Sequence, residues 1–319
     1  MKKLLMILCS AFLIAGCTTS NPSGSVATPT TSPEVKSEPV VLNVLAPRGA
    51  TALAMIPVIK NETAKVTFVD GTDVIQAAFV NPNPEYSIIV APTNLGAKLA
   101  LGDKTKYKML GVITWGNLYL VGNDDNALQQ EGNLAAFGEG AVPGLVFEAT
   151  NKDIVPTVTY YNGVADAQAA LISGNANVAL LAEPAATATI GKMKEQGKEV
   201  KIIGDLQKEF ATISGGEGYP QAAIYVLEDK YNENKEFYDS FITTIADYTA
   251  NINDSTMDSL KSDIEAITPE ELGVPNAEIV AKTWSRMNIR YVPAKDVIDQ
   301  LNTFLALFDI QSVDSVIIK

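Results

Sequence analysis

The chain has 319 residues, a formal net charge of −13 and no histidine. So acidic a body repels the phosphates of nucleic acids and the anionic surface of a membrane, so we expect no nucleic-acid partner and no direct electrostatic binding to lipid. The absence of histidine removes the commonest general base and metal ligand of proteins.

The N-terminus has the pattern of a secretory signal peptide. Lys2 and Lys3 precede an apolar run at 4–14, which is too short to span a bilayer, because spanning takes roughly 20 apolar residues. The following sequence IAGC resembles the bacterial lipobox, in which the cysteine is diacylated and becomes the first mature residue. We predict that residues 1–16 are removed and that Cys17 carries lipid. The alternative is a plain signal peptide whose cysteine is incidental.

The other cysteine, Cys9, lies inside the predicted signal peptide, so the mature chain can form no internal disulfide. Residues 17–39 comprise the lipidated cysteine and a stretch rich in Ser, Thr and Pro with few large apolar side chains. That composition is typical of a flexible tether. The folded part is expected to begin near Val40, and it is long enough for one large core or two lobes.

From Val40 onward, short β-rich runs alternate with helical patterns, which is typical of βαβ units and a largely parallel sheet. The first series predicts strands at 40–46, 64–69, 87–91 and 107–113, and helices at 51–59, 72–79 and 94–101. A second series from about Leu118 predicts strands at 134–137, 155–160, 178–181 and 200–203, a helix at 165–173, and helices opened by Pro143 and Pro184. After a return strand at 221–227, the tail is predicted to be mostly helical, at 235–253, 276–285 and 294–308.

Ligands of open α/β sheets bind beyond the carboxyl ends of the strands, where loops lead into helix N-termini. Thr51, Thr72 and Asn94 stand at such junctions and are good N-cap residues, and Pro143 suits a first helical turn. Capping explains each residue taken alone. As a set, the junctions predict a cleft into which several helix N-termini present backbone N–H groups.

The stretch GEGAVPG at 138–144 superficially resembles a phosphate-binding loop. It lacks the Lys-Ser/Thr ending of a P-loop, and Pro143 takes the place of the last glycine of GxGxxG. We interpret it as a strand-to-helix turn whose small residues let the backbone approach a ligand or the opposite lobe.

Glu183 follows a predicted buried strand and precedes Pro184. Two interpretations are open. The carboxylate could complement the dipole of the next helix, which contributes about 0.3–1 kcal/mol, or it could point into the cleft and accept hydrogen bonds from a ligand.

Several aromatic residues lie at or near the same loops, namely Trp115, Tyr119, Tyr160, Tyr161 and Tyr219. Each alone is explained by core packing, but Trp115 is surrounded by Thr, Gly and Asn, which favours an exposed stacking face. Arg48 is the only basic residue of these loops. Its pairing with Glu183 in one cleft favours a neutral, zwitterionic or heteroaromatic ligand, although helix N-termini alone can hold an anion.

The sequence carries no enzyme motif. It has no GxSxG elbow, no free thiol in the predicted mature chain and no recognisable spacing of metal ligands. We therefore expect no catalytic residues, no metal and no cofactor.

Five stretches resemble the substrate-binding lipoproteins of ABC importers in the nitrate, sulfonate, taurine and thiamine-pyrimidine group. They are VLAPRGATALA, YSIIVAPTNLGAKLA, FGEGAVPGLVF, DAQAALISGNANVALLAEPAATA and GYPQAAIYV. The resemblance extends over about 42–308. It implies an α/β, two-lobed type II periplasmic-binding-protein fold with two crossovers, in which 40–119 and 221–319 form lobe one and 120–220 form lobe two.

The resemblance also implies a function. The protein is expected to be a monomer, lipid-anchored on the extracytoplasmic face of the cell membrane, that captures a small molecule and delivers it to an ABC permease. The candidate ligand contacts are Arg48, Thr51, Thr93, Asn94, Thr114, Trp115, Asn117, Val142, Gly144, Glu183 and Tyr219.

The expected ligand is pyrimidine-like or a small sulfonate. The cysteine-rich motif of the fungal pyrimidine-synthesis relatives is absent, however, and Ala185 replaces the tryptophan that usually follows Glu-Pro in sulfonate binders. The alternatives are a sensory or interaction module and an enzyme built on the same fold.

Overall fold

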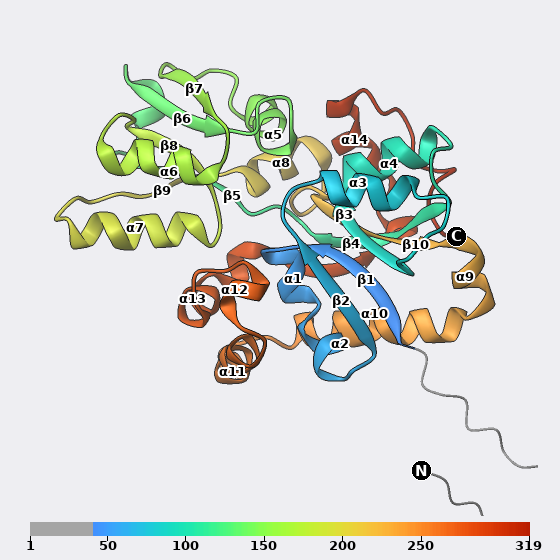
Figure 1. Cartoon of the computed structure of the whole chain (residues 1–319). Coiled ribbons are helices and arrows are strands. Elements are labelled where there is room, and N and C mark those ends of the chain that lie inside the picture. The colour runs from blue at the N-terminus through green and yellow to red at the C-terminus, as the bar shows by residue number, and fades with distance from the viewer. Residues whose placement is uncertain (1–40) are drawn as a thin grey trace, which may run out of the picture. The chain divides into compact units, whose positions relative to one another are not determined.

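The computed structural model describes residues 41–319 (Figure 1). The predicted signal peptide, the lipidation site at Cys17 and the tether lie outside the described residues. Within the described part, no helix is both long and apolar enough to cross a membrane.

The first sheet, in the described residues, has six strands in the order β11-β4-β10-β3-β1-β2. They are β1 (Leu42–Pro47), β2 (Ala64–Val69), β3 (Ile88–Pro92), β4 (Tyr107–Thr114), β10 (Ala222–Leu227) and β11 (Ile289–Pro293). β1 pairs in parallel with β2 and β3, whereas β10 runs antiparallel to β3 and β4, and β11 antiparallel to β4. The return strand predicted at 221–227 therefore lies between β3 and β4.

The second sheet, over the same described range, has five strands in the order β7-β6-β8-β5-β9. They are β5 (Leu118–Gly122), β6 (Asn133–Phe137), β7 (Thr157–Tyr161), β8 (Val178–Ala182) and β9 (Lys201–Asp205). The chain leaves the first sheet after β4 and returns to it at β10. The predicted α/β, two-lobed architecture with two crossovers is confirmed. The expected lobe boundary at 119/120 falls inside β5, all of which pairs in the second sheet.

Helices cover both sheets. Lobe one carries α1 (Ala50–Ala54), α2 (Ile56–Lys60), α3 (Asp73–Val80), α4 (Thr93–Leu101), α9 (Glu228–Glu233), α10 (Lys235–Ala250), α11 (Met257–Ile267), α12 (Pro269–Leu272), α13 (Ala277–Met287) and α14 (Ile298–Leu305). Lobe two carries α5 (Val142–Thr150), α6 (Val164–Ser173), α7 (Ala185–Glu195) and α8 (Leu206–Ser214). Short 3-10 turns lie at Ala127–Gln129, Ala294–Asp296 and Ala306–Phe308.

Each sheet is a middle layer with helices packed on both of its faces. Side chains that alternate along a strand face opposite sides of the sheet, so each strand contributes to the core on both faces. In β1, Leu45 packs into the core under α3, α4 and α14, whereas Val44 and Ala46 pack into the core with α1, α2, α10 and α13. The second sheet is covered by α5 and α8 on one face and by α6 and α7 on the other. Figure 1 shows the same arrangement of α3 and α4 opposite α1, α2 and α10.

The structure corrects several local predictions. The helix expected at 51–59 is two short helices that meet at Met55. Thr72 stands at the N-cap of α3 but makes no side-chain capping bond, and Gly49 and Pro92 hold the N-caps of α1 and α4. The tail is mostly helical, but the sequence did not predict the strand β11: Asn288 adopts a left-handed conformation that ends α13, and the next residues pair with β4. Gly174 ends α6 as a C-cap in the left-handed conformation, which glycine adopts readily.

Candidate functional site

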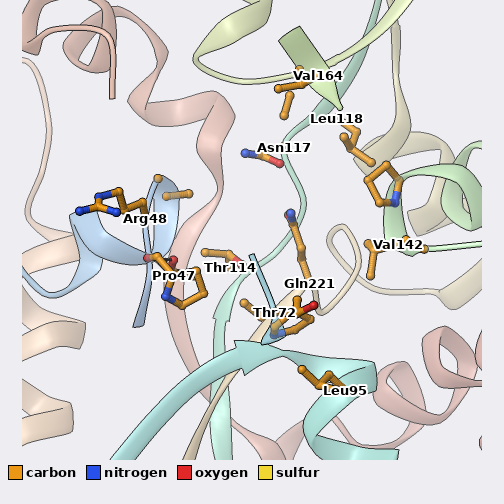
Figure 2. Close-up of a pocket in the computed structure, with 18 of the residues that line it drawn as sticks. Pro47, Arg48, Thr72, Leu95, Thr114, Asn117, Leu118, Val142, Val164 and Gln221 are labelled. Carbon is orange, nitrogen blue, oxygen red and sulfur yellow. Dashed lines mark hydrogen bonds between the residues drawn. The ribbon is translucent and has the colours of Figure 1, made fainter. Parts of the chain in front are cut away.

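A cavity of about 970 Å³ lies at the strand ends where both lobes meet the crossovers. Its walls come from the loop after β1, the start of α4 and the starts of α5 and α7. Its floor includes Thr114, Asn117 and Gln221, which stand at the two crossovers. Figure 2 shows these three side chains between Arg48 and Thr72 on one side and Val142 and Val164 on the other. This is the position at which open α/β folds bind ligands.

The cavity brings together most of the residues predicted from the sequence. Those that line it are Arg48, Thr51, Asn94, Thr114, Asn117, Val142 and Glu183. The candidates outside the lining are Thr93, Trp115, Gly144 and Tyr219.

The prediction of an exposed stacking face on Trp115 is wrong. Its side chain is 1% exposed, its indole N–H donates to the carbonyl of Arg290 at 3.2 Å, and the guanidinium of Arg290 lies 4.7 Å from the ring centroid. Tyr219 is fully buried and stacks on Phe304. Both aromatic rings hold the crossovers against the C-terminal segment, a contact that the local sequence could not indicate because the partners are distant in the chain.

Gly144 and Thr93 build the wall behind the cavity. The N–H of Gly144 donates to the carbonyl of Gly138 at 3.0 Å, and a Cβ at Gly144 would lie 2.5 Å from that oxygen. The small residue is therefore needed for the turn into α5. Thr93 is fully buried, and its carbonyl accepts a hydrogen bond from Tyr225.

Glu183 lies at the inner edge of lobe two, but its carboxylate is already paired. The side chain is 0% exposed and accepts from the Arg286 Nε at 2.8 Å. The backbone N–H and hydroxyl of Thr187, in the first turn of α7, also donate to it. In this structure the Glu183 carboxylate thus binds the first turn of α7 and joins it to α13 of lobe one, rather than presenting a free charge to a ligand. No sequence motif singles out Arg286.

The cationic groups of the cavity also differ from the prediction. Arg48 pairs with Asp70 at 2.6 Å, and its Nε donates to the carbonyl of Glu271. Lys98 and Lys104 line the cavity as well, and both are exposed. Sequence reasoning missed them because they lie within and after α4 rather than in a strand-end loop.

Three side-chain amides of the lining carry buried oxygens with no hydrogen-bond partner among the described residues. They belong to Asn94, Asn117 and Gln221. The amide nitrogen of Asn117 donates to the carbonyl of Glu183 at 2.9 Å, so its oxygen is the free end. Gln221 was predicted only as part of a strand. Its position one residue before β10 places it at the second crossover.

Burial shifts the pKa of two groups near the cavity. Burial raises the pKa of Tyr119 above its usual range, so the hydroxyl stays protonated and donates to the carbonyl of Arg286 at 2.9 Å. Burial also lowers the pKa of the Arg290 guanidinium. Among the described residues, no group of three or more Asp, Glu, Cys or His side chains is placed to hold a metal ion.

Comparison with known proteins identifies the fold. No protein-family model matches the sequence, and no curated protein matches it. Among solved structures, an ABC transporter protein from Parabacteroides distasonis matches with a TM-score of 0.68 and 23% identity, covering 85% of this chain and 92% of that chain. The periplasmic aliphatic sulphonate-binding protein SsuA from Escherichia coli matches with a TM-score of 0.63 and 14% identity, covering 88% and 93%.

The periplasmic nitrate-binding protein NrtA from Synechocystis PCC 6803 matches with a TM-score of 0.52 and 13% identity, covering 77% of this chain and 70% of that chain. The resemblance stated from the sequence is therefore confirmed at the level of the fold. This chain has the two-lobed architecture of the periplasmic binding proteins of ABC importers.

Proposed function

We propose that this protein is the extracytoplasmic substrate-binding component of an ABC importer, which captures a small molecule between its lobes and delivers it to a transmembrane permease. The observation that carries the proposal is the cavity of about 970 Å³, bounded by both lobes. Its floor holds side-chain amides at the crossovers whose buried oxygens have no hydrogen-bond partner among the described residues. Its size lies within the range of small-molecule sites, about 300–1,000 Å³.

The proposed movement is closure of the lobes about the two crossovers. Residues 115–117 and 219–221 connect the sheets, so a small backbone rotation there would change the width of the cavity. We take these crossovers as the lobe boundaries, which assigns the whole of β5 to lobe two.

The N-terminal sequence supports the proposed location. A lipid on Cys17, followed by a tether through residue 39, would hold the folded part near the membrane without a spanning helix. A monomer suits this role, because the permease rather than a second copy would receive the solute.

Native mass spectrometry of the intact protein, purified without denaturation, tests capture of a solute. We expect a bound small molecule that is released on unfolding. Ala185→Trp places a large ring at the cavity wall and is expected to abolish the bound species. Lys192→Trp, on the exposed side of the same helix, is the matched control and should retain it. A wild-type protein that never carries or binds a small molecule would contradict the proposal.

A further inference from the structure

The chemistry of the cavity floor indicates which kind of solute fits it, and this inference rests on the proposed function. The charged groups that reach the cavity from strand-end loops are neutralised within the protein. Glu183 is paired with Arg286, and Arg48 is paired with Asp70. Lys98 and Lys104 also line the cavity, but both residues are exposed. The floor between them is formed by uncharged side chains.

Asn117 has the most restricted orientation of these groups. It is 7% exposed, and its amide nitrogen is held by the carbonyl of Glu183 at 2.9 Å. Its buried oxygen has no partner in the described part of the chain. A buried acceptor without a donor costs about 1–3 kcal/mol, so a ligand that brings an N–H or O–H group to this oxygen is favoured over one that does not.

Gln221 complements Asn117 from the second crossover. Figure 2 shows its side chain extending from the floor toward Asn117. A side-chain amide offers both a donor and an acceptor, and the side chain of Gln221 makes no hydrogen bond to residues 41–319 that fixes it elsewhere. Thr114, at the end of β4, adds a hydroxyl to the same floor.

The rest of the lining is largely apolar. Leu95, Leu118, Phe137, Val142 and Val164 surround the amide floor. This arrangement suits a molecule with an apolar body and a polar edge directed at the crossovers. An oxyanion would instead face the buried oxygen of Asn117, which repels it, and would find no unpaired cation on the floor.

We infer that the solute is uncharged where it meets the crossovers and carries an amide-like edge. A donor on this edge reaches the oxygen of Asn117, and an adjacent acceptor is bound by Gln221. Primary and secondary amides, lactams and N–H heterocycles belong to this class, whereas small sulfonates do not.

Three probes with the same aromatic body test the inference by thermal shift of the intact protein at millimolar concentration. Benzamide has the amide edge, N,N-dimethylbenzamide lacks the donor, and benzenesulfonate is an anion. Because binding to the native state raises its stability, we expect benzamide to raise Tm and the other two probes to leave it unchanged. A shift with benzenesulfonate that equals or exceeds the shift with benzamide, or no shift with benzamide, would overturn the inference.

Variants of Gln221 and Asn117 test whether benzamide binds at the floor of the cavity. Gln221→Leu removes an amide that makes no hydrogen bond to another side chain or backbone group in the described part of the chain, and Asn117→Leu removes the fixed acceptor. Each is expected to weaken benzamide binding about threefold to tenfold, as the loss of one hydrogen bond predicts. Asn232→Leu, on the exposed side of α9, should bind benzamide like the wild type. Equal binding by all three variants would contradict the assignment.

The two proposals fail in different ways. A sulfonate preference in this assay would overturn the ligand class while a co-purified solute kept the proposed function. Absence of any captured solute in native mass spectrometry would contradict the function, and the benzamide series would still decide the chemistry of the cavity.

Discussion

The contact between Glu183 and Arg286 makes a specific prediction about stability. It joins the start of α7 in lobe two to the end of α13 in lobe one, and the Arg286 Nη2 also donates to the Thr187 hydroxyl at 2.7 Å. Arg286→Met keeps most of the aliphatic side chain and removes the charge. The Glu183 carboxylate would then remain buried with Thr187 as its hydrogen-bond partner.

The expected loss of stability follows from the burial of the two side chains. Removing one partner of a buried ion pair costs about 3–5 kcal/mol. The side chain of Arg286 is 36% exposed, whereas that of Glu183 is 0% exposed, so partial solvent screening lowers our expectation to about 2–3 kcal/mol. At about 2–4 °C per kcal/mol for a chain of this size, Tm should fall by about 4–12 °C.

Thermal unfolding of a double-mutant cycle measures the effect. Glu183→Gln combined with Arg286→Met removes both charges, so it should recover a large part of the stability lost in the single arginine variant. Arg48→Met is the matched control, because Arg48 pairs with Asp70, whose side chain is 80% exposed, and its loss should cost less than about 1 kcal/mol. Equal destabilisation by Arg286→Met and Arg48→Met, or strict additivity in the cycle, would refute the reasoning.

Three further predictions concern single sites. Gly144→Ala should lower Tm, because the new Cβ would lie 2.5 Å from the carbonyl oxygen of Gly138. Gly191→Ala, within α7 and with open space around its Cβ, should be neutral or stabilising by up to about 1 kcal/mol. Thermal unfolding that ranks the two variants the other way would contradict this prediction. Burial raises the pKa of Glu209, so its contribution to stability is full below about pH 4.3 and is lost as pH rises through the folded pKa. Glu209→Gln should therefore match the wild type in acid and exceed it at neutral pH, and a pH-independent difference would argue against this. Asn276→Ala removes the side-chain cap of α13 and should cost about 1 kcal/mol in a denaturant titration, whereas an unchanged midpoint would show that the cap contributes nothing.

Local patterning predicted most of the fold. The alternation of strands and helices from Val40 to Leu227 follows from residues that are close in sequence, and the boundaries of β2 were predicted without error. The errors arose where contacts between residues distant in sequence determine the secondary structure. β11 is a short segment that becomes a strand because it pairs with β4, and Met55 interrupts an otherwise continuous helical pattern.

The strand-end loops predicted residues that line one cavity, among them Arg48, Asn117 and Glu183. Their charge pairing was not predictable from the sequence. The sequence could not show that Arg286 would neutralise Glu183, because that contact joins residues about a hundred positions apart. Nor could it show that Trp115 would be covered by Arg290.

Small-angle X-ray scattering tests the central claim, closure over a solute, most directly. The intact protein is measured as purified, after unfolding and refolding to remove bound solute, and after return of a low-molecular-mass cell extract. We predict that the radius of gyration rises when the solute is removed and falls when the extract is returned, and that Ala185→Trp does not respond to the extract. An identical radius of gyration in all three states of the wild type would contradict capture by lobe closure.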